Sequence, residues 1–186
     1  QVDGLGPPVW IDALKDGNTD ESLGTTETCR QVTGETGSEF DVDVVVSNIT
    51  NLSGFMLTVY FDSQYVSFKE ADSNFILAKN GGPVGTSPPS EGTVNGSTAK
   101  FVMLRVKLQD KDDNGVIVQP VSGTGVLTRL TFVVKDSKGQ TGIDLPPDAE
   151  GQGIMLLTSR EIVNGQVVDE GLNPDSAHAV SQIVTD

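Results

Sequence analysis

SGFMLTVYFDSQYVSF, residues 53–68, indicates its secondary structure more clearly than any other stretch of the chain. Large apolar residues recur in it with a period of two, and a second set of residues falls between them. Successive side chains of a strand point to opposite faces, so one set can line a core while the other faces outward. We predict a strand that buries Phe55, Leu57, Val59 and Phe61 and presents Met56, Thr58 and Tyr60 on its outer face.

The same alternation predicts strands on both sides of this stretch. It is clear in residues 40–46, 99–108 (AKFVMLRVKL) and 125–135 (GVLTRLTFVVK). Glycine and proline fall between the apolar runs, and we find neither an amphipathic helix nor an internal repeat. About nine short strands separated by turn signals favour an all-β sandwich over parallel βαβ units.

Parity assigns the faces of the two later runs. Apolar side chains, methionine and arginine on a rigid sheet are typical of a protein-binding surface, unless another sheet or loop covers that surface. We expect the inward residues to be Val102, Leu104, Val106 and Leu108 in the first run, and Leu130, Phe132 and Val134 in the second. The outward set is then Phe101, Met103, Arg105, Lys107, Arg129, Thr131, Val133 and Lys135.

Charge argues against several classes of partner. The chain has 26 acidic and 12 basic residues, a net charge of −14. Such a surface repels phosphate backbones, so nucleic acid and anionic membrane are poor partners, whereas a basic or metal-dependent protein fits better. We find no apolar run long enough to span a bilayer and no signal peptide in the opening residues.

Catalytic chemistry is not indicated. The chain has one histidine, His178, and one cysteine, Cys29, with no nucleophile-elbow motif and no possible internal disulfide. Many carboxylate pairs exist, but none is singled out for glycoside hydrolysis. One tryptophan and two tyrosines make a poor sugar-stacking platform. A carbohydrate-binding sandwich therefore stays open only as an alternative.

One loop resembles the opening half of a calcium site. Residues 110–115, DKDDNG, place oxygen-bearing side chains at positions one, three and five and glycine at six. Position twelve is Val121, where a calcium loop needs glutamate, and strands rather than helices flank the segment. A solvated hairpin turn uses the same residue types. The weak calcium candidates are Asp110, Asp112 and Asn114.

Four segments, in order and spacing, resemble the cohesin modules of cellulosome-type assemblies. GSEFDVDVVVSNITN (37–51) and GFMLTVYFDSQYVSF (54–68) look like the family's second and third strands, and VNGSTAKFVMLRV (94–106) and GTGVLTRLTFVVK (123–135) look like its fifth and sixth. The sequence departs at Ser63 and Val66, which replace the proline and leucine of the family's turn. Residues 15–38 and 161–176 look like insertions in a single domain spanning 1–186.

The resemblance implies a nine-stranded jelly-roll β-sandwich without catalytic activity or a cofactor of its own. It implies that the module docks a calcium-loaded dockerin at an extracellular or cell-surface location, through a sheet made of strands eight, three, six and five. The alternative is an adhesive or carbohydrate-binding sandwich that self-associates through the same face. Parity and resemblance together predict the partner-binding residues Gly54, Met56, Thr58, Tyr60, Met103, Arg105, Lys107, Leu108, Arg129 and Thr131.

Overall fold

The computed structural model describes residues 9–32, 35–79, 84–86, 88–107, 120–136, 139–146, 153–158, 161–163, 166–168 and 180–185. Nearly all of the secondary structure in these residues is β-strand, with one short 3₁₀ turn, and no helix in them is long and apolar enough to cross a membrane. The elements are β1 (Val9–Asp12), β2 (Cys29–Val32), β3 (Glu39–Asp62), β4 (Val66–Asp72), η1 (Ile76–Ala78), β5 (Val84–Thr86), β6 (Ser90–Asn95), β7 (Thr98–Lys107), β8 (Val121–Val134), β9 (Gly139–Asp144), β10 (Ile154–Thr158), β11 (Glu161–Val163), β12 (Gln166–Val168) and β13 (Val180–Thr185).

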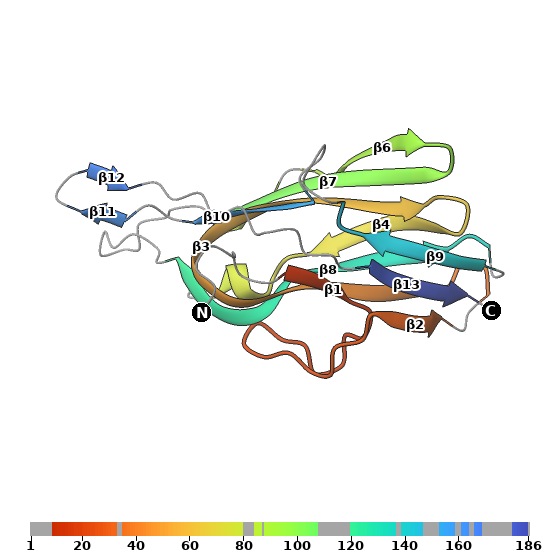
Figure 1. Cartoon of the computed structure of the whole chain (residues 1–186), viewed down its shortest axis with the longest axis horizontal. Coiled ribbons are helices and arrows are strands. Elements are labelled where there is room, and N and C mark those ends of the chain that lie inside the picture. The colour runs from red at the N-terminus through yellow and green to blue at the C-terminus, as the bar shows by residue number, and fades with distance from the viewer. Residues whose placement is uncertain are drawn as a thin grey trace.

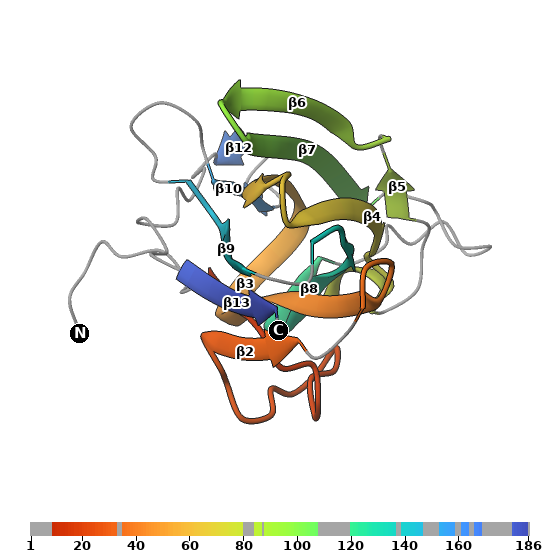
Figure 2. The ribbon, with the colours of Figure 1, turned by 90° about the vertical axis from the view of Figure 1, so that its right-hand side faces the viewer.

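The 24-residue strand β3 joins the two layers of the fold. Its first half pairs with β1 and β8, and β8 also pairs with β4. Its second half pairs with β7 and β10, and β7 pairs in turn with β5 and β6. Figure 2 shows β6 and β7 on one side of the molecule and β13 and β2 on the other. The predicted all-β jelly-roll sandwich is confirmed, with short segments added to its main strands, such as β11 and β12 (Figure 1) and β5 (Figure 2).

Two asparagines bend β3 between the layers. Asn48 and Asn51 have φ angles of 57° and 56°, and the pairing with β8 shifts register on either side of them. This left-handed conformation costs most residues about 1–2 kcal/mol, but asparagine tolerates it. The exposed backbone N–H groups of the two residues donate to Thr124 Oγ1 and Ser122 Oγ, each at 3.0 Å. A single continuous strand can therefore serve both sheets.

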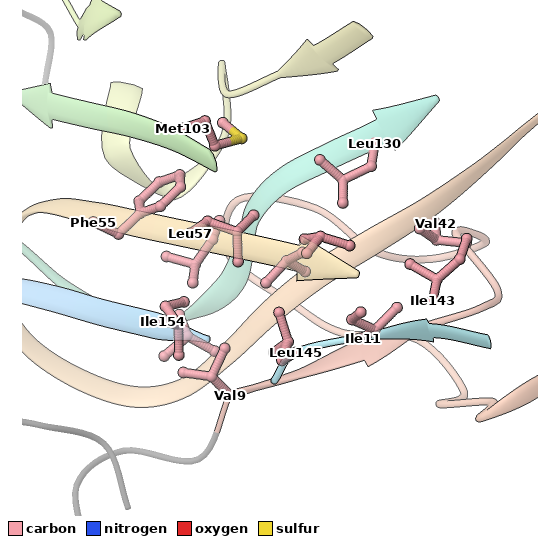
Figure 3. Packing of buried hydrophobic residues seen from close by; sticks show 14 of the residues in the cluster. Val9, Ile11, Val42, Phe55, Leu57, Met103, Leu130, Ile143, Leu145 and Ile154 are labelled. Atoms are coloured by element: carbon pink, nitrogen blue, oxygen red, sulfur yellow. The ribbon is translucent and has the colours of Figure 1, made fainter. Parts of the chain in front are cut away.

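The core lies between the layers and contains the inward set predicted for residues 55–61. Phe55, Leu57 and Val59 are fully buried, and Phe61 is 4% exposed. Phe61 contacts Phe132 edge-on, with 5.5 Å between the ring centroids. The predicted parity of this part of β3 is confirmed, and so is that of Leu130, Phe132 and Val134 in β8. Figure 3 shows several of these side chains packed together.

The parity predicted for β7 is wrong. Met103 is buried and points into the core (Figure 3), and Phe101 is buried with its ring centroid 4.0 Å from that of Phe68. Leu104, predicted to face inward, is 37% exposed. The prediction placed the cation-bearing side of the strand in solvent, but Arg105 is buried with Met103. Phe101 packs against the rings of Phe68 and Phe132, and this packing sets the orientation of β7.

Candidate protein-binding face

The outer face of the second half of β3 and of β7 forms one surface, which we call the β3–β7 face. Residues directly opposite each other in an antiparallel pair share a face. In this pair Met56 lies opposite Leu104, and Thr58 lies opposite Val102. The complete set is Gly54, Met56, Thr58, Tyr60 and Asp62 on β3 and Thr98, Lys100, Val102, Leu104 and Val106 on β7.

Large apolar side chains are exposed here. Among the described residues, the large hydrophobic side chains classed as exposed are Val94, at 43%, and Leu104, at 37%. Leu104 lies on the β3–β7 face, and Val94 belongs to β6, the neighbouring strand of the same sheet. Met56, Val102 and Val106 are partly exposed beside Leu104, whereas Val94 lies further along the sheet, near the turn between β6 and β7. Apolar side chains that cluster in this way mark interaction sites more often than scattered ones do.

The structure brings together only some of the predicted partner-binding residues. Met56 and Tyr60 are partly exposed on the β3–β7 face, whereas Thr58 is only 8% exposed and Gly54 is buried. Met103 and Arg105 face the core, so their predicted outward positions are wrong. The structure does not describe the side chain of Lys107. The other predicted residues of this region lie outside the described residues: Leu108, Asp110, Asp112 and Asn114.

Arg105 is accommodated inside the sandwich by polar neighbours. Its Nε donates to Ser73 Oγ at 3.2 Å, and Ser73 donates in turn to Thr128 Oγ1 at 3.1 Å. A guanidinium nitrogen also donates to the carbonyl of Leu104 at 2.9 Å. Burial lowers the pKa of Arg105. These internal partners explain how a cation can lie on the core side of β7, a possibility that parity alone cannot reveal.

Arg129 and Thr131 lie in β8, on the other sheet from Met56, so placing them on one surface with β7 is wrong. Arg129 makes a bidentate pair with the fully buried Asp43, at 2.7 and 2.9 Å. Hydrogen bonding to Asp43 raises the pKa of Arg129. Thr131 donates to Asp41 at 2.8 Å. The groove beside them is lined by four acidic residues, Glu39, Asp41, Glu70 and Asp72.

A loop between β1 and β2 is held against this second sheet by buried polar groups. Asn18 Nδ2 donates to Asp12 Oδ2 at 3.1 Å and to Asp43 Oδ2 at 3.2 Å. Asn18 Oδ1 accepts from the backbone N–H of Gly24 at 2.8 Å, and Asp12 Oδ1 accepts from that of Glu27 at 3.0 Å. Arg129 therefore belongs to an internal network that orders the loop. Alternation along one strand carries no signal of such a network.

The fold and this face define a β-sandwich with an apolar sheet surface suited to binding another protein. The model of the cohesin domain matches residues 26–147. The chain belongs to the cohesin family. Cohesins are non-catalytic protein-binding modules, and this chain is therefore a binding module and not an enzyme.

Solved structures of cohesins share the fold. The sixth cohesin of scaffoldin B from Acetivibrio cellulolyticus, solved in complex with a mutant Cel5 dockerin, is 16% identical, with a TM-score of 0.51 over 97% of this chain and 99% of that chain. A cohesin named Coh-OlpA from Clostridium thermocellum, solved in a type I cohesin–dockerin complex, is 11% identical, with a TM-score of 0.52 over 96% and 97%. A comparison with curated protein sequences gives no significant match.

Proposed function

We propose that this cohesin binds a dockerin-type protein module through the β3–β7 face. Family membership supports the class of partner, since similar cohesins have been solved in complex with dockerins. The observation that carries the location is the exposed apolar cluster centred on Met56 and Leu104, which lie opposite each other in the sheet. A rigid sheet holds these side chains in place before the partner arrives, which lowers the entropic cost of binding.

The residues of the proposed contact differ from those that the sequence predicted. Met56 and Tyr60 remain, with Thr58 and Gly54 between and beside them as smaller contributors. Leu104 takes the central position that had been assigned to Met103. Flanking Leu104 on β7 are Val102 and Val106.

Calcium and location complete the proposal. We expect calcium to bind the dockerin, so a chelator should abolish binding without unfolding the cohesin. The module would serve the assembly of enzymes outside the cell or at its surface. Its acidic surface, with a net charge of −14, fits a partner that binds a cation or carries basic residues.

Calorimetric titration tests the proposal with the calcium-loaded dockerins encoded in the parent genome. Leu104→Asp places a charge at the centre of the apolar contact, and we expect affinity to fall by at least about 30-fold, as at a binding hot spot. Gln64→Asp is the matched control, because Gln64 is exposed in the turn after β3 and lies off the face. A folded Leu104→Asp protein with wild-type affinity would rule out this face.

Light scattering on the free module completes the test, because the same exposed face could also close a homodimer. A monomer at all protein concentrations, together with saturable dockerin binding, supports the proposal. A dimer that Leu104→Asp dissociates, without dockerin binding by the wild type, would favour self-association instead.

A further inference from the structure

The β3–β7 face carries a polar row where β3 pairs with β9. Tyr60 of β3 lies opposite Lys100 of β7 on one side and opposite Asp144 of β9 on the other. All three side chains are partly exposed. The next positions along the face, Thr58 with Val102 and Met56 with Leu104, carry no charge. Two acidic residues therefore lie at this end of a mainly apolar surface: Asp144, and Asp62 one pair further along, whose Oδ1 accepts from the backbone N–H of Gln64 at 2.9 Å.

The carboxyl group of Asp144 is in an unusual environment. Its Oδ1 atom is buried and has no hydrogen-bond partner among the described residues, and burial raises the pKa of Asp144. Gly142, two positions earlier in β9, leaves room for it: a Cβ atom on Gly142 would lie 2.8 Å from Asp144 Oδ2. A buried acceptor without a donor costs free energy comparable with a lost hydrogen bond, and such a group requires an explanation.

Within the part of the chain that the structure describes, the neighbouring groups do not supply that donor. On β3, Tyr60 is directly opposite, and on β13, Val180 is the register partner. Lys100 is two strands away from Asp144, so their backbones are about 10 Å apart at the usual strand spacing. No ion pair joins the two residues in the described part of the chain. The Asp144 side chain is partly exposed, so a cation from outside the module can approach its accessible part and stabilise the charged form of the carboxyl group.

We propose that Asp144 is the polar anchor of the β3–β7 face and accepts a charge-assisted hydrogen bond from a lysine or arginine of the docked dockerin. The inference rests on the proposed function. An ionised carboxylate only accepts hydrogen bonds, and a cationic donor stabilises the charge that burial disfavours. Because the anchor marks one end of an apolar surface, it also distinguishes the two directions in which a partner can lie across that surface.

Binding measurements test the anchor with a dockerin that binds the wild-type module. We expect Asp144→Asn to weaken binding about tenfold at neutral pH, the size of one charge-assisted hydrogen bond. Gly142→Ala keeps the charge but displaces the carboxyl group, and it should weaken binding as well. Asp16→Asn removes an exposed carboxylate from the loop after β1, and it should leave affinity unchanged. Unchanged or tighter binding by Asp144→Asn would overturn the inference.

A second measurement does not depend on any variant. The carboxyl carbon signal of Asp144 can be followed by NMR against pH in the free module and in the complex. A cationic partner should lower the pKa of Asp144 on binding, whereas a purely structural carboxylate would titrate identically in both. An unchanged or higher pKa in the complex would also overturn the inference. If the wild type binds no dockerin at all, the proposed function fails and this inference fails with it.

Discussion

Met103 and Leu104 are adjacent in β7 and have opposite roles. Met103 is 1% exposed and belongs to the core, whereas Leu104 is exposed on the β3–β7 face. Hydrophobicity does not distinguish them, because both are large and apolar. Which of them is inside depends on the orientation of the whole strand, and a rotation by one residue would exchange them.

Alanine substitutions should separate the two residues by their effect on stability. Met103→Ala leaves a cavity in the core, so we expect a loss of about 2–5 kcal/mol in the free energy of unfolding. Leu104→Ala removes a partly exposed side chain and should change stability by about 0.5 kcal/mol or less. Urea unfolding measures both. Equal losses would contradict the orientation of β7.

Asp144 should make stability depend on pH. Burial raises its pKa above the ordinary 3.8, so the folded state holds this proton more tightly than the unfolded state does. The stabilisation that the proton provides is complete below pH 3.8 and is lost as the pH rises through the raised pKa. Asp144→Asn removes this titration and should lose less stability than the wild type over that pH window.

Urea unfolding at a series of pH values checks this expectation, with Asp16→Asn as the control. Asp16 is exposed, so its substitution should leave the pH profile of the wild type in place. If the free energy of unfolding changed with pH in the same way for the wild type and for Asp144→Asn, the expected contribution of Asp144 would be contradicted.

At the scale of elements, β8 and the loop after β1 form a unit around a buried ion pair. Asp43 has no exposed surface, and Arg129 supplies its cation. Asn18 links Asp43 to Asp12 and so connects the loop with the sheet. This arrangement orders part of the segment 15–38, which has no apolar alternation of its own.

Arg129→Met should therefore affect stability and not partner binding. Removing one member of a buried ion pair leaves the other uncompensated, which typically costs about 3–5 kcal/mol. Lys135→Met is the control, because Lys135 is an exposed cation just beyond β8. Chemical denaturation measures the loss. A stable Arg129→Met module with weakened dockerin binding would instead indicate that Arg129 contacts the partner.

At the scale of the molecule, the outer faces of the two sheets differ in chemistry. The β3–β7 face is mainly apolar, whereas the groove on the other sheet is lined by four acidic residues around Arg129. Net charge alone would suggest a partner held by electrostatics. The geometry instead supports a contact made mostly by apolar burial, with charge concentrated at its β9 end.

Dockerin binding should consequently depend little on salt. Between about 0.1 and 1 M salt the Debye length falls from about 10 Å to about 3 Å, which screens exposed charges but not apolar contacts. We expect wild-type affinity to fall by no more than the roughly tenfold assigned to Asp144, and Asp144→Asn to show almost no change. Calorimetry at several salt concentrations measures this. A fall of a hundredfold or more would indicate a contact dominated by charge.

Most of the fold was predictable because its signals are local. The period-two pattern from Phe55 to Phe61 specifies a strand and its buried side, since every outward position there is smaller or more polar than its neighbours. Asn-Gly is a typical hairpin-turn dipeptide, and a tight turn forms at Asn95–Gly96: Gly96 has a φ of 54°, and Asn95 pairs with Thr98 across it. The candidate site was predictable only in part, because β7 is apolar on both of its faces.

The sequence by itself determined the β class of the protein, the buried side of β3 and the family resemblance, because these follow from residue types at short spacing. Only the tertiary structure decided that Leu104, and not Met103, is exposed, and that Arg129 serves the interior. The physical reason is that both outcomes depend on long-range packing. Phe101 sets the orientation of β7 by packing against Phe68 of β4 and Phe132 of β8. Arg129 pairs with the carboxylate of Asp43, which lies 86 residues earlier in the chain.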